Sequence, residues 1–359
     1  MHLYKNEYVE AEDAFRKAIQ LSPNYATAYQ WYASLVGNFP LRIQERMELI
    51  QKAAELDPRS PVIAVNLGDA YRERGLYSMA ERQYLKVIDL DPESTVPYRA
   101  LASFYLYNTS RNDFALTNAL KAHALDPGGV WSLTILLEIY LELGDLESAA
   151  DVRERLSELD ANHPSVGFAD VSINMYKNNP AGTRESINWL LPKITGNLFA
   201  TMNMGAVELM LGDKYRAREI FVLSVPGWLN PDQWEDLISI YDTNGCIFSW
   251  ILINTGDPEL GEQLLKQTTV FLTETLPALD EHADWYAPEI CYLTAGDTEK
   301  ALKSIETYLA HNHLSGWNEF HQLPMYDLIR HEPRYQAALQ ERERRIEIQR
   351  EAIKAGGSL

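Results

Sequence analysis

Apolar and small side chains recur along this chain in a paired pattern. Within each stretch they are spaced three or four residues apart, which places them on one face of a helix. Small residues suit places where two antiparallel helices cross closely, and large residues suit the space between neighbouring helix pairs. The pattern therefore predicts helical hairpins. One stretch reads Leu67-Gly68, Tyr71, Ala80, Tyr84 and Val87, and the next reads Leu101-Ala102, Tyr105, Ala115, Ala119 and Ala122.

Prolines mark the ends of these stretches at nearly equal intervals. Pro23, Pro58, Pro92 and Pro127 each follow a leucine and one polar residue, and they lie 35, 34 and 35 residues apart. Ala161 takes the same place 34 residues later. Because proline cannot continue a helix, each one is expected to stop the second helix of a hairpin and to start the turn to the next.

The spacing of these residues resembles the tetratricopeptide repeat. Leu67-Gly68, Tyr71, Ala80, Tyr84 and Pro92 fit its pattern, which has a period of about 34 residues. The resemblance is strong over residues 1–160. It implies an all-α, right-handed superhelical solenoid with a concave groove, formed here by about nine helical hairpins and closed by a C-terminal capping helix.

The second half of the chain keeps the hairpins but loses the prolines. Its turns are predicted at Gly212-Asp213, Gly256-Asp257 and Gly296-Asp297, with glycine ending one helix and aspartate capping the next. Residues 163–194 fit one divergent pair. The predicted divisions are regular repeats over 1–161, with the first truncated, degenerate repeats over 162–312, and C-terminal capping helices over 313–359.

The two ends suggest a larger protein. Met1 lies about one turn before the second helix of a repeat, so a preceding first helix is expected upstream. In the tail, Tyr335, Leu339, Ile346 and Ile353 share one helix face. A capping helix is favoured, and the alternative of a dimerising coil leaves a homodimer open. The segment from Leu328 to Leu339 resembles the closing segment of tetratricopeptide regions in bacterial regulators, which implies a winged-helix, cyclase or kinase domain upstream.

The charge of the chain limits the kinds of partner that are expected, and its two cysteines bear on whether a disulfide is expected. The 32 Lys and Arg against 51 Asp and Glu give a net charge of −19. Such a surface repels nucleic acid and anionic membranes, so a basic or neutral apolar peptide is the expected partner. Cys246 and Cys291 are expected to be buried thiols in preference to a disulfide. The cytoplasm is favoured, and the periplasm is the alternative if a membrane segment lies upstream.

A ligand groove is expected on the first helix of each hairpin. In the tetratricopeptide family its second, fifth, sixth and ninth positions face inward. These positions lack both the Lys/Asn clamp for carboxylates and the asparagine ladder of glycosyltransferases, and an apolar, aromatic lining remains, suited to an apolar or amphipathic segment. The alternative is that this lining packs against the protein itself. The predicted residues are Gln30, Trp31, Val62, Val65, Asn66, Val96, Arg99, Trp131, Ile135, Phe168 and Asn203.

Recognised catalytic motifs are missing from the sequence. It has no phosphate-binding G-x-x-x-x-G-K-[ST], no G-x-S-x-G, no H-E-x-x-H and no paired C-x-x-C. We therefore expect no catalytic residues, no metal and no cofactor. The leading hypothesis is a protein-binding region of a larger bacterial regulator. A free-standing adaptor is the alternative, and an enzyme would require a convergent pocket of titratable groups.

Overall fold

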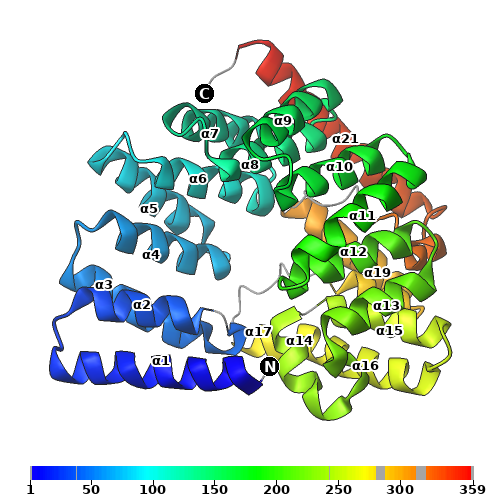
Figure 1. The fold of residues 1–359 in the computed structure, drawn as a ribbon, viewed down its shortest axis with the longest axis horizontal. Helices are drawn as coiled ribbons and strands as arrows, with labels where there is room; N and C mark the ends of the chain where they lie inside the picture. The colour runs from blue at the N-terminus through cyan, green and yellow to red at the C-terminus, as the bar shows by residue number, and fades with distance from the viewer. Residues whose placement is uncertain (1, 38, 242, 280–287, 313–320, 357–359) are drawn as a thin grey trace. The chain divides into compact units, whose positions relative to one another are not determined.

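The computed structural model describes residues 2–37, 39–241, 243–279, 288–312 and 321–356, and all regular elements within these ranges are helical (Figure 1). Consecutive helices pack in pairs as antiparallel hairpins. The predicted all-α fold is confirmed, and its hairpins are those of a tetratricopeptide-type solenoid. Trp285 and residues 313–320, which belong to the predicted third degenerate repeat and to the capping region, lie outside the described residues.

The helices form two compact units, each described by itself. Unit 1 comprises Met1–Leu101 and Glu274–Trp285, and unit 2 comprises Ala102–Thr273 and Tyr286–Leu359. In unit 1, α2 pairs with α3 and α4 with α5. The elements that begin in unit 1 are α1 (His2–Leu21), α2 (Ala26–Val36), η1 (Pro40–Arg42), α3 (Ile43–Leu56), α4 (Pro61–Glu73), α5 (Tyr77–Leu90), α6 (Thr95–Ser103) and α17 (Leu276–Leu279).

Unit 2 continues the same pairing, and its hairpins α8/α9, α10/α11 and α12/α13 stack side by side (Figure 1). Two further hairpins, α15/α16 and α18/α19, follow before the last helix. The elements are η2 (Phe104–Asn108), α7 (Asn112–Leu125), α8 (Val130–Glu142), α9 (Leu146–Leu159), α10 (Pro164–Tyr176), α11 (Pro180–Ile194), α12 (Leu198–Met210), α13 (Lys214–Ser224), η3 (Pro226–Leu229), η4 (Pro231–Gln233), α14 (Trp234–Tyr241), α15 (Asn244–Asn254), α16 (Pro258–Val270), η5 (Phe271–Thr275), α18 (Glu289–Thr294), α19 (Thr298–Ala310), η6 (Pro324–Leu328) and α21 (Pro333–Lys354).

In several hairpins a glycine sits where the two helices cross. A Cβ atom on Gly68 would lie 2.5 Å from the ring of Tyr84, so only glycine lets α4 and α5 approach this closely. Tyr84 is fully buried, and its hydroxyl donates a 2.8 Å hydrogen bond to Asp69. Gly205 meets Phe221 in the same way in the α12/α13 hairpin. The predicted close crossing is thus present in both units.

The Gly-Asp turns also have their predicted geometry. Gly212 and Gly296 have φ values of +86° and +77°, a conformation that favours glycine. Asp213 and Asp297 then cap the following helices by accepting hydrogen bonds of 3.0 and 3.1 Å from the amide three residues on. Asp257 is different, because its side chain makes no cap and pairs instead with Arg218.

The expectation of two free thiols is wrong. Cys246 on α15 and Cys291 on α18 are fully buried, their Cα atoms lie 5.0 Å apart, and they form a disulfide within unit 2. The two cysteines are 45 residues apart in the sequence. Their pairing depends on the packing of α15 against α18, which no local pattern reveals.

The C-terminal helix α21 packs within unit 2 against α19 and α7. Tyr335 and Ile346 are buried, and Leu339 and Ile353 are partly buried, so the predicted apolar face is covered by the protein's own helices. Polar contacts fix its position. Arg342 donates a 2.7 Å hydrogen bond to Glu142 at the end of α8, and both side chains are nearly buried.

Further along α21, two side chains reach the turns inside the α7 and α8 hairpins. Gln349 accepts a 3.0 Å hydrogen bond from the Asn112 amide and donates one of 2.7 Å to the Ser110 carbonyl. Arg350 donates one of 2.6 Å to the Leu143 carbonyl. These carbonyls and amides end helices and would otherwise need water. The helix therefore acts as the predicted cap, at a place the sequence did not specify.

Candidate binding surfaces

Three of the predicted groove residues in unit 1 are exposed apolar side chains. Trp31 on α2, Val62 on α4 and Val96 on α6 have exposed fractions of 55%, 56% and 45%. They lie on the first helices of three successive hairpins, at positions predicted to face inward. Arg99, one turn after Val96, is also exposed. We call Trp31, Val62 and Val96 the apolar stripe.

Other predicted residues of unit 1 serve the packing between helices. Gln30 and Val65 are buried, with exposed fractions of 5% and 8%. The amides of Gln30 and Asn66 both donate to the Ser34 hydroxyl at 3.4 Å, and the Asn66 contact joins α4 to α2. Asn66 itself is half-buried. The side chains of Gln30 and Asn66 thus help to hold together the helices that carry Trp31 and Val62.

The four predicted residues of unit 2 are less exposed. Ile135 on α8 is buried, and Trp131 is half-buried. Phe168 on α10 packs against a core cluster that includes Ile187, while Asn203 on α12 is half-buried. In unit 2, therefore, these positions contribute mainly to the core, and they do not make a stripe like that of unit 1.

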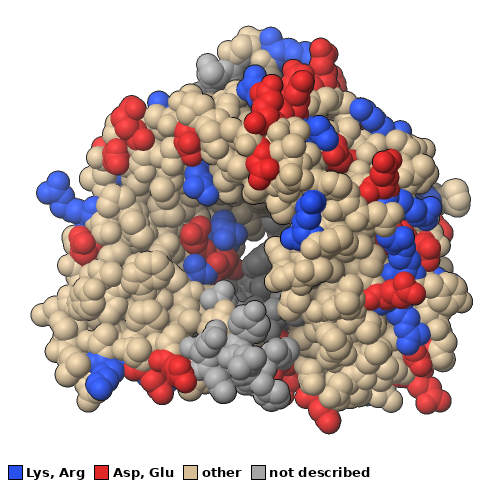
Figure 2. All heavy atoms as spheres, in the orientation of Figure 1, with Lys and Arg blue, Asp and Glu red and all other residues tan. Residues whose placement is uncertain are grey.

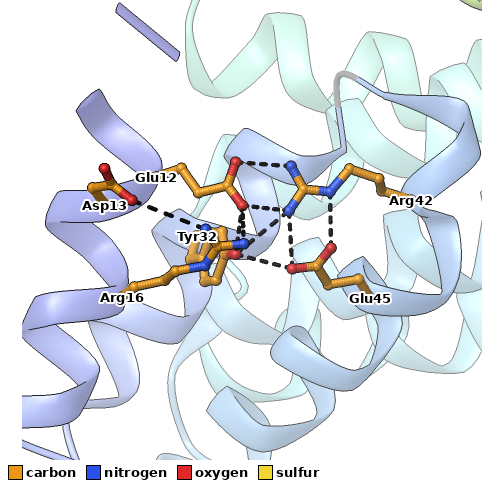
Figure 3. A network of polar contacts seen from close by, with 6 residues as sticks. All are labelled: Glu12, Asp13, Arg16, Tyr32, Arg42 and Glu45. Atoms are coloured by element: carbon orange, nitrogen blue, oxygen red, sulfur yellow. Dashed lines mark hydrogen bonds and ion pairs between the residues drawn. The ribbon is translucent and has the colours of Figure 1, made fainter. Parts of the chain in front are cut away.

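A polar network joins α2 to its neighbours α1 and α3 (Figure 3). Tyr32, the neighbour of Trp31, is buried with its hydroxyl 2.9 Å from an oxygen of Glu12 on α1 and 2.9 Å from one of Glu45 on α3. Arg42 donates to both carboxylates at 2.6–3.0 Å. The network ties three helices together beside the apolar stripe.

The charges in this network shift one another's titration. Hydrogen bonds from Arg42 lower the pKa of Glu12 to about 2, and they lower the pKa of Glu45 as well. Burial, together with the two carboxylates, raises the pKa of Tyr32 to about 12. All four groups therefore keep their charge state at neutral pH, and the network is a fixed support and not a proton-transfer site.

Four titratable residues meet in unit 2, at α18, η6 and α21. The Tyr326 hydroxyl donates to Glu289 at 3.3 Å, and the Tyr335 hydroxyl lies 2.6 Å from Nδ1 of His321. The His321 ring stacks on both tyrosines, with centroids 4.7 and 5.3 Å away. Glu289, Tyr326 and Tyr335 are buried, so these two hydrogen-bonded pairs lie within the core and offer no open substrate site.

Charged groups are mixed over the surface. Lys and Arg lie among Asp and Glu on the face seen in Figure 2, and uncharged residues cover most of it. On this face the acidic residues are dispersed and are not gathered in one patch. Within the described residues, no helix is long and apolar enough to cross a bilayer, and no three His, Cys, Asp or Glu side chains are grouped to hold a metal ion.

Comparisons with known proteins agree with this geometry. Residues 63–94, which span α4 and α5, match the family model of the tetratricopeptide repeat. No curated protein sequence matches the chain. Among solved structures, the human IFIT1 dimer with m7Gppp-AAAA is 16% identical, over 85% of this chain and 67% of that one, with a TM-score of 0.50.

Two further structures have similar helical arrays. The IFIT1 monomeric mutant with Gppp-AAAA is 14% identical over 73% of this chain and 67% of its own, with a TM-score of 0.50. A tetratricopeptide repeat protein from Parabacteroides merdae is 13% identical over 76% of this chain and 99% of its own, with a TM-score of 0.49. At these identities the likeness concerns the fold alone. The chain thus contains a tetratricopeptide repeat at residues 63–94, and the hairpins around it continue the same type of fold.

Proposed function

We propose that this protein is a binding scaffold that takes an apolar or amphipathic segment of another protein on the apolar stripe of unit 1. The exposure of Trp31, Val62 and Val96 carries the proposal. Their helices are anchored by buried neighbours, so the stripe is held rigidly while it remains open. Aromatic side chains on rigid supports are the usual anchors of protein interfaces.

Charge favours a partner with basic flanking residues. The net charge of −19 attracts cationic segments and slows the approach of anionic ones, most strongly at low ionic strength. An amphipathic helix with leucines or phenylalanines on one face and lysines or arginines beside it fits both features. Its apolar face would cover the stripe, and the net negative charge of the chain would attract its basic residues.

The test uses peptides selected from a displayed library of amphipathic helices, with affinity measured by calorimetry. Trp31→Ala should weaken the selected peptides by at least about tenfold, as expected for loss of an aromatic anchor. Leu85→Ala is the matched control, because Leu85 is 44% exposed on α5, a second helix of unit 1. Equal affinity for the wild type and Trp31→Ala would refute the proposal.

A finer proposal concerns the protein around this scaffold. We propose that it is the recognition region of a larger bacterial regulator, and the support is the sequence pattern from Leu328 to Leu339. A free-standing adaptor is the alternative, and an enzyme is disfavoured by the burial of Glu289 and its partners. Sequencing the gene upstream of Met1 separates the first two: a regulator requires an in-frame DNA-binding, cyclase or kinase domain.

A further inference from the structure

One hairpin of unit 2 departs from the packing rule of the hairpins before it. The seventh position of the first helix is a buried leucine in three successive hairpins, and the eleventh is a tyrosine. These residues are Leu67, Leu101 and Leu136, and Tyr71, Tyr105 and Tyr140. Adding 34 residues to the last of each series gives Asp170 and Asn174 on α10. Two large side chains are thus replaced by two smaller polar ones.

A groove opens where these side chains would have been. Its volume is about 570 Å³, and it runs along α9, α10 and α11. Asp170 and Asn174 line it together with Val166, one turn before Asp170 on the same face of α10. A leucine and a tyrosine here would point into this space. The groove therefore follows from the change in residue type at two repeat positions.

The groove lies on the face of α10 away from the predicted ligand surface. Asp170 follows Phe168 by two residues, which is about 200° around a helix. Phe168 packs against the core cluster, while Asp170 is one-third exposed. The groove is also separate from the apolar stripe, which belongs to unit 1. Asp170 and Asn174 stand at repeat positions other than those expected to face inward.

The groove walls are held in place. Arg153 on α9 donates to both oxygens of Asp170, at 2.7 and 2.8 Å, so these two charges neutralise each other. Trp189 on α11 packs on Gly167 so closely that a Cβ there would lie 2.7 Å from the indole. Trp189 still has 37% of its surface exposed, with the Lys193 amine 4.2 Å from its ring. The indole forms a rigid edge of the groove.

The side-chain amide of Asn174 offers a hydrogen-bond donor that could pair with a peptide backbone. Asn174 accepts a 2.9 Å hydrogen bond from the Asn179 amide, and its own amide makes one long contact of 3.4 Å to Ser186. A side-chain amide has two N–H donors, so Asn174 keeps a second one for a ligand. This N–H can donate to a carbonyl oxygen of a peptide backbone.

The charge of the ligand is indicated by Glu185. This exposed glutamate lines the groove on α11 and makes no ion pair with any residue that the structure describes. Arg153 is already paired with Asp170, so the groove offers little to an anion. We propose that the groove binds an extended peptide segment with a basic side chain. The peptide backbone pairs with Asn174, and the basic side chain meets Glu185.

The test fills the groove with the residues of the preceding hairpins. Asp170→Leu with Asn174→Tyr should keep the helical circular-dichroism spectrum and the melting temperature, because the partly exposed Arg153 can be solvated. The probes are capped heptapeptides with a central Arg or Lys in neutral sequence, their Glu-centred counterparts, and an array of saccharides. Basic peptides should bind the wild type and should not bind the filled variant.

A second variant keeps the test decisive if the filled variant does not fold. Glu185→Gln should weaken basic peptides by about fivefold, the effect of one partly exposed ion pair. Glu219→Gln is the control, because Glu219 is an exposed glutamate on α13, outside the groove lining. Equal binding of Glu-centred peptides, binding of saccharides in their place, or basic peptides unaffected by Glu185→Gln would overturn the proposal. Trp31→Ala, which tests the apolar stripe, should leave this binding unchanged.

Discussion

The buried carboxyl of Glu289 is expected to make the stability of unit 2 depend on pH in an unusual direction. Burial raises its pKa to about 7, against an ordinary value of 4.5, although Tyr326 and Ser304 donate weakly to it. Below pH 4.5 the carboxyl is protonated in both the folded and the unfolded protein. Between pH 4.5 and 7 only the folded protein keeps the proton, so the free energy of unfolding falls as the pH rises.

The size of this effect follows from the two pKa values. Each pKa unit corresponds to about 1.4 kcal/mol, so the difference between about 7 and 4.5 is worth about 3 kcal/mol. Glu289→Gln keeps the shape of the side chain but has no proton to lose. Relative to the wild type, the variant should gain about 3 kcal/mol in unfolding free energy as the pH rises from about 4.5 to about 7.5.

The titration of His321 adds a second contribution to the pH dependence of stability, and this one is present in both the wild type and Glu289→Gln. Burial, with Arg342 and Arg330 nearby, lowers its pKa to about 3, so the folded protein holds the ring neutral. The unfolded chain takes up a proton below pH 6.5, and stability is therefore lost as the pH falls from 6.5 towards 3. Between pH 4.5 and 6.5 the contributions of His321 and Glu289 oppose each other. Removing Glu289 should expose a rise in stability with pH that the wild type conceals.

The assay is urea denaturation followed by far-ultraviolet circular dichroism, at several pH values from about 4.5 to about 7.5. His123, whose pKa burial also lowers, is present in both proteins and drops out of the difference. Carbon-13 NMR of labelled glutamate, assigned with the variant, gives the pKa of Glu289 directly. The reasoning is wrong if that carboxyl titrates near 4.5, or if the variant loses relative stability as the pH rises.

Two further predictions concern unit 2. Cys246→Ser, or treatment with a reducing agent, should lower the free energy of unfolding by about 4 kcal/mol, the chain-entropy value for a 45-residue loop, and non-reducing mass spectrometry should show no free thiol in the untreated protein. Arg342→Met should destabilise the protein by about 3 kcal/mol, because it removes the guanidinium that pairs with the nearly buried Glu142, and should speed hydrogen exchange in α21. Adding Glu142→Met should recover most of that loss, and an equal loss in both variants would contradict the account.

Much of the fold could be predicted because its signals are local. A proline usually ends a helix, and a glycine readily takes the positive φ at a helix end, so the period and the turns at Gly212 and Gly296 could be predicted from the sequence. The close crossing of two helices at Gly68 could also be predicted from the sequence, because a glycine is needed there only when another helix lies against it.

The surfaces were predicted less well, because exposure depends on the rotation of each helix. Neighbouring residues point about 100° apart, so a register error of one residue exchanges a buried side chain for an open one. Gln30 and Trp31 were both assigned to the groove, yet their exposed fractions are 5% and 55%. The apolar stripe is the part of that assignment that remains open to a partner.

By itself, the sequence determined the hairpins, their period and the apolar face of the last helix, since each depends on residues a few positions apart. Only the tertiary structure decided which distant residues meet. It brought Cys246 to Cys291 and Arg342 to Glu142, pairs that are 45 and 200 residues apart. In the sequence, Asp170 and Asn174 only depart from the residue types of the preceding repeats. They line a groove in the folded protein, because the space they leave exists only when α9 and α11 flank α10.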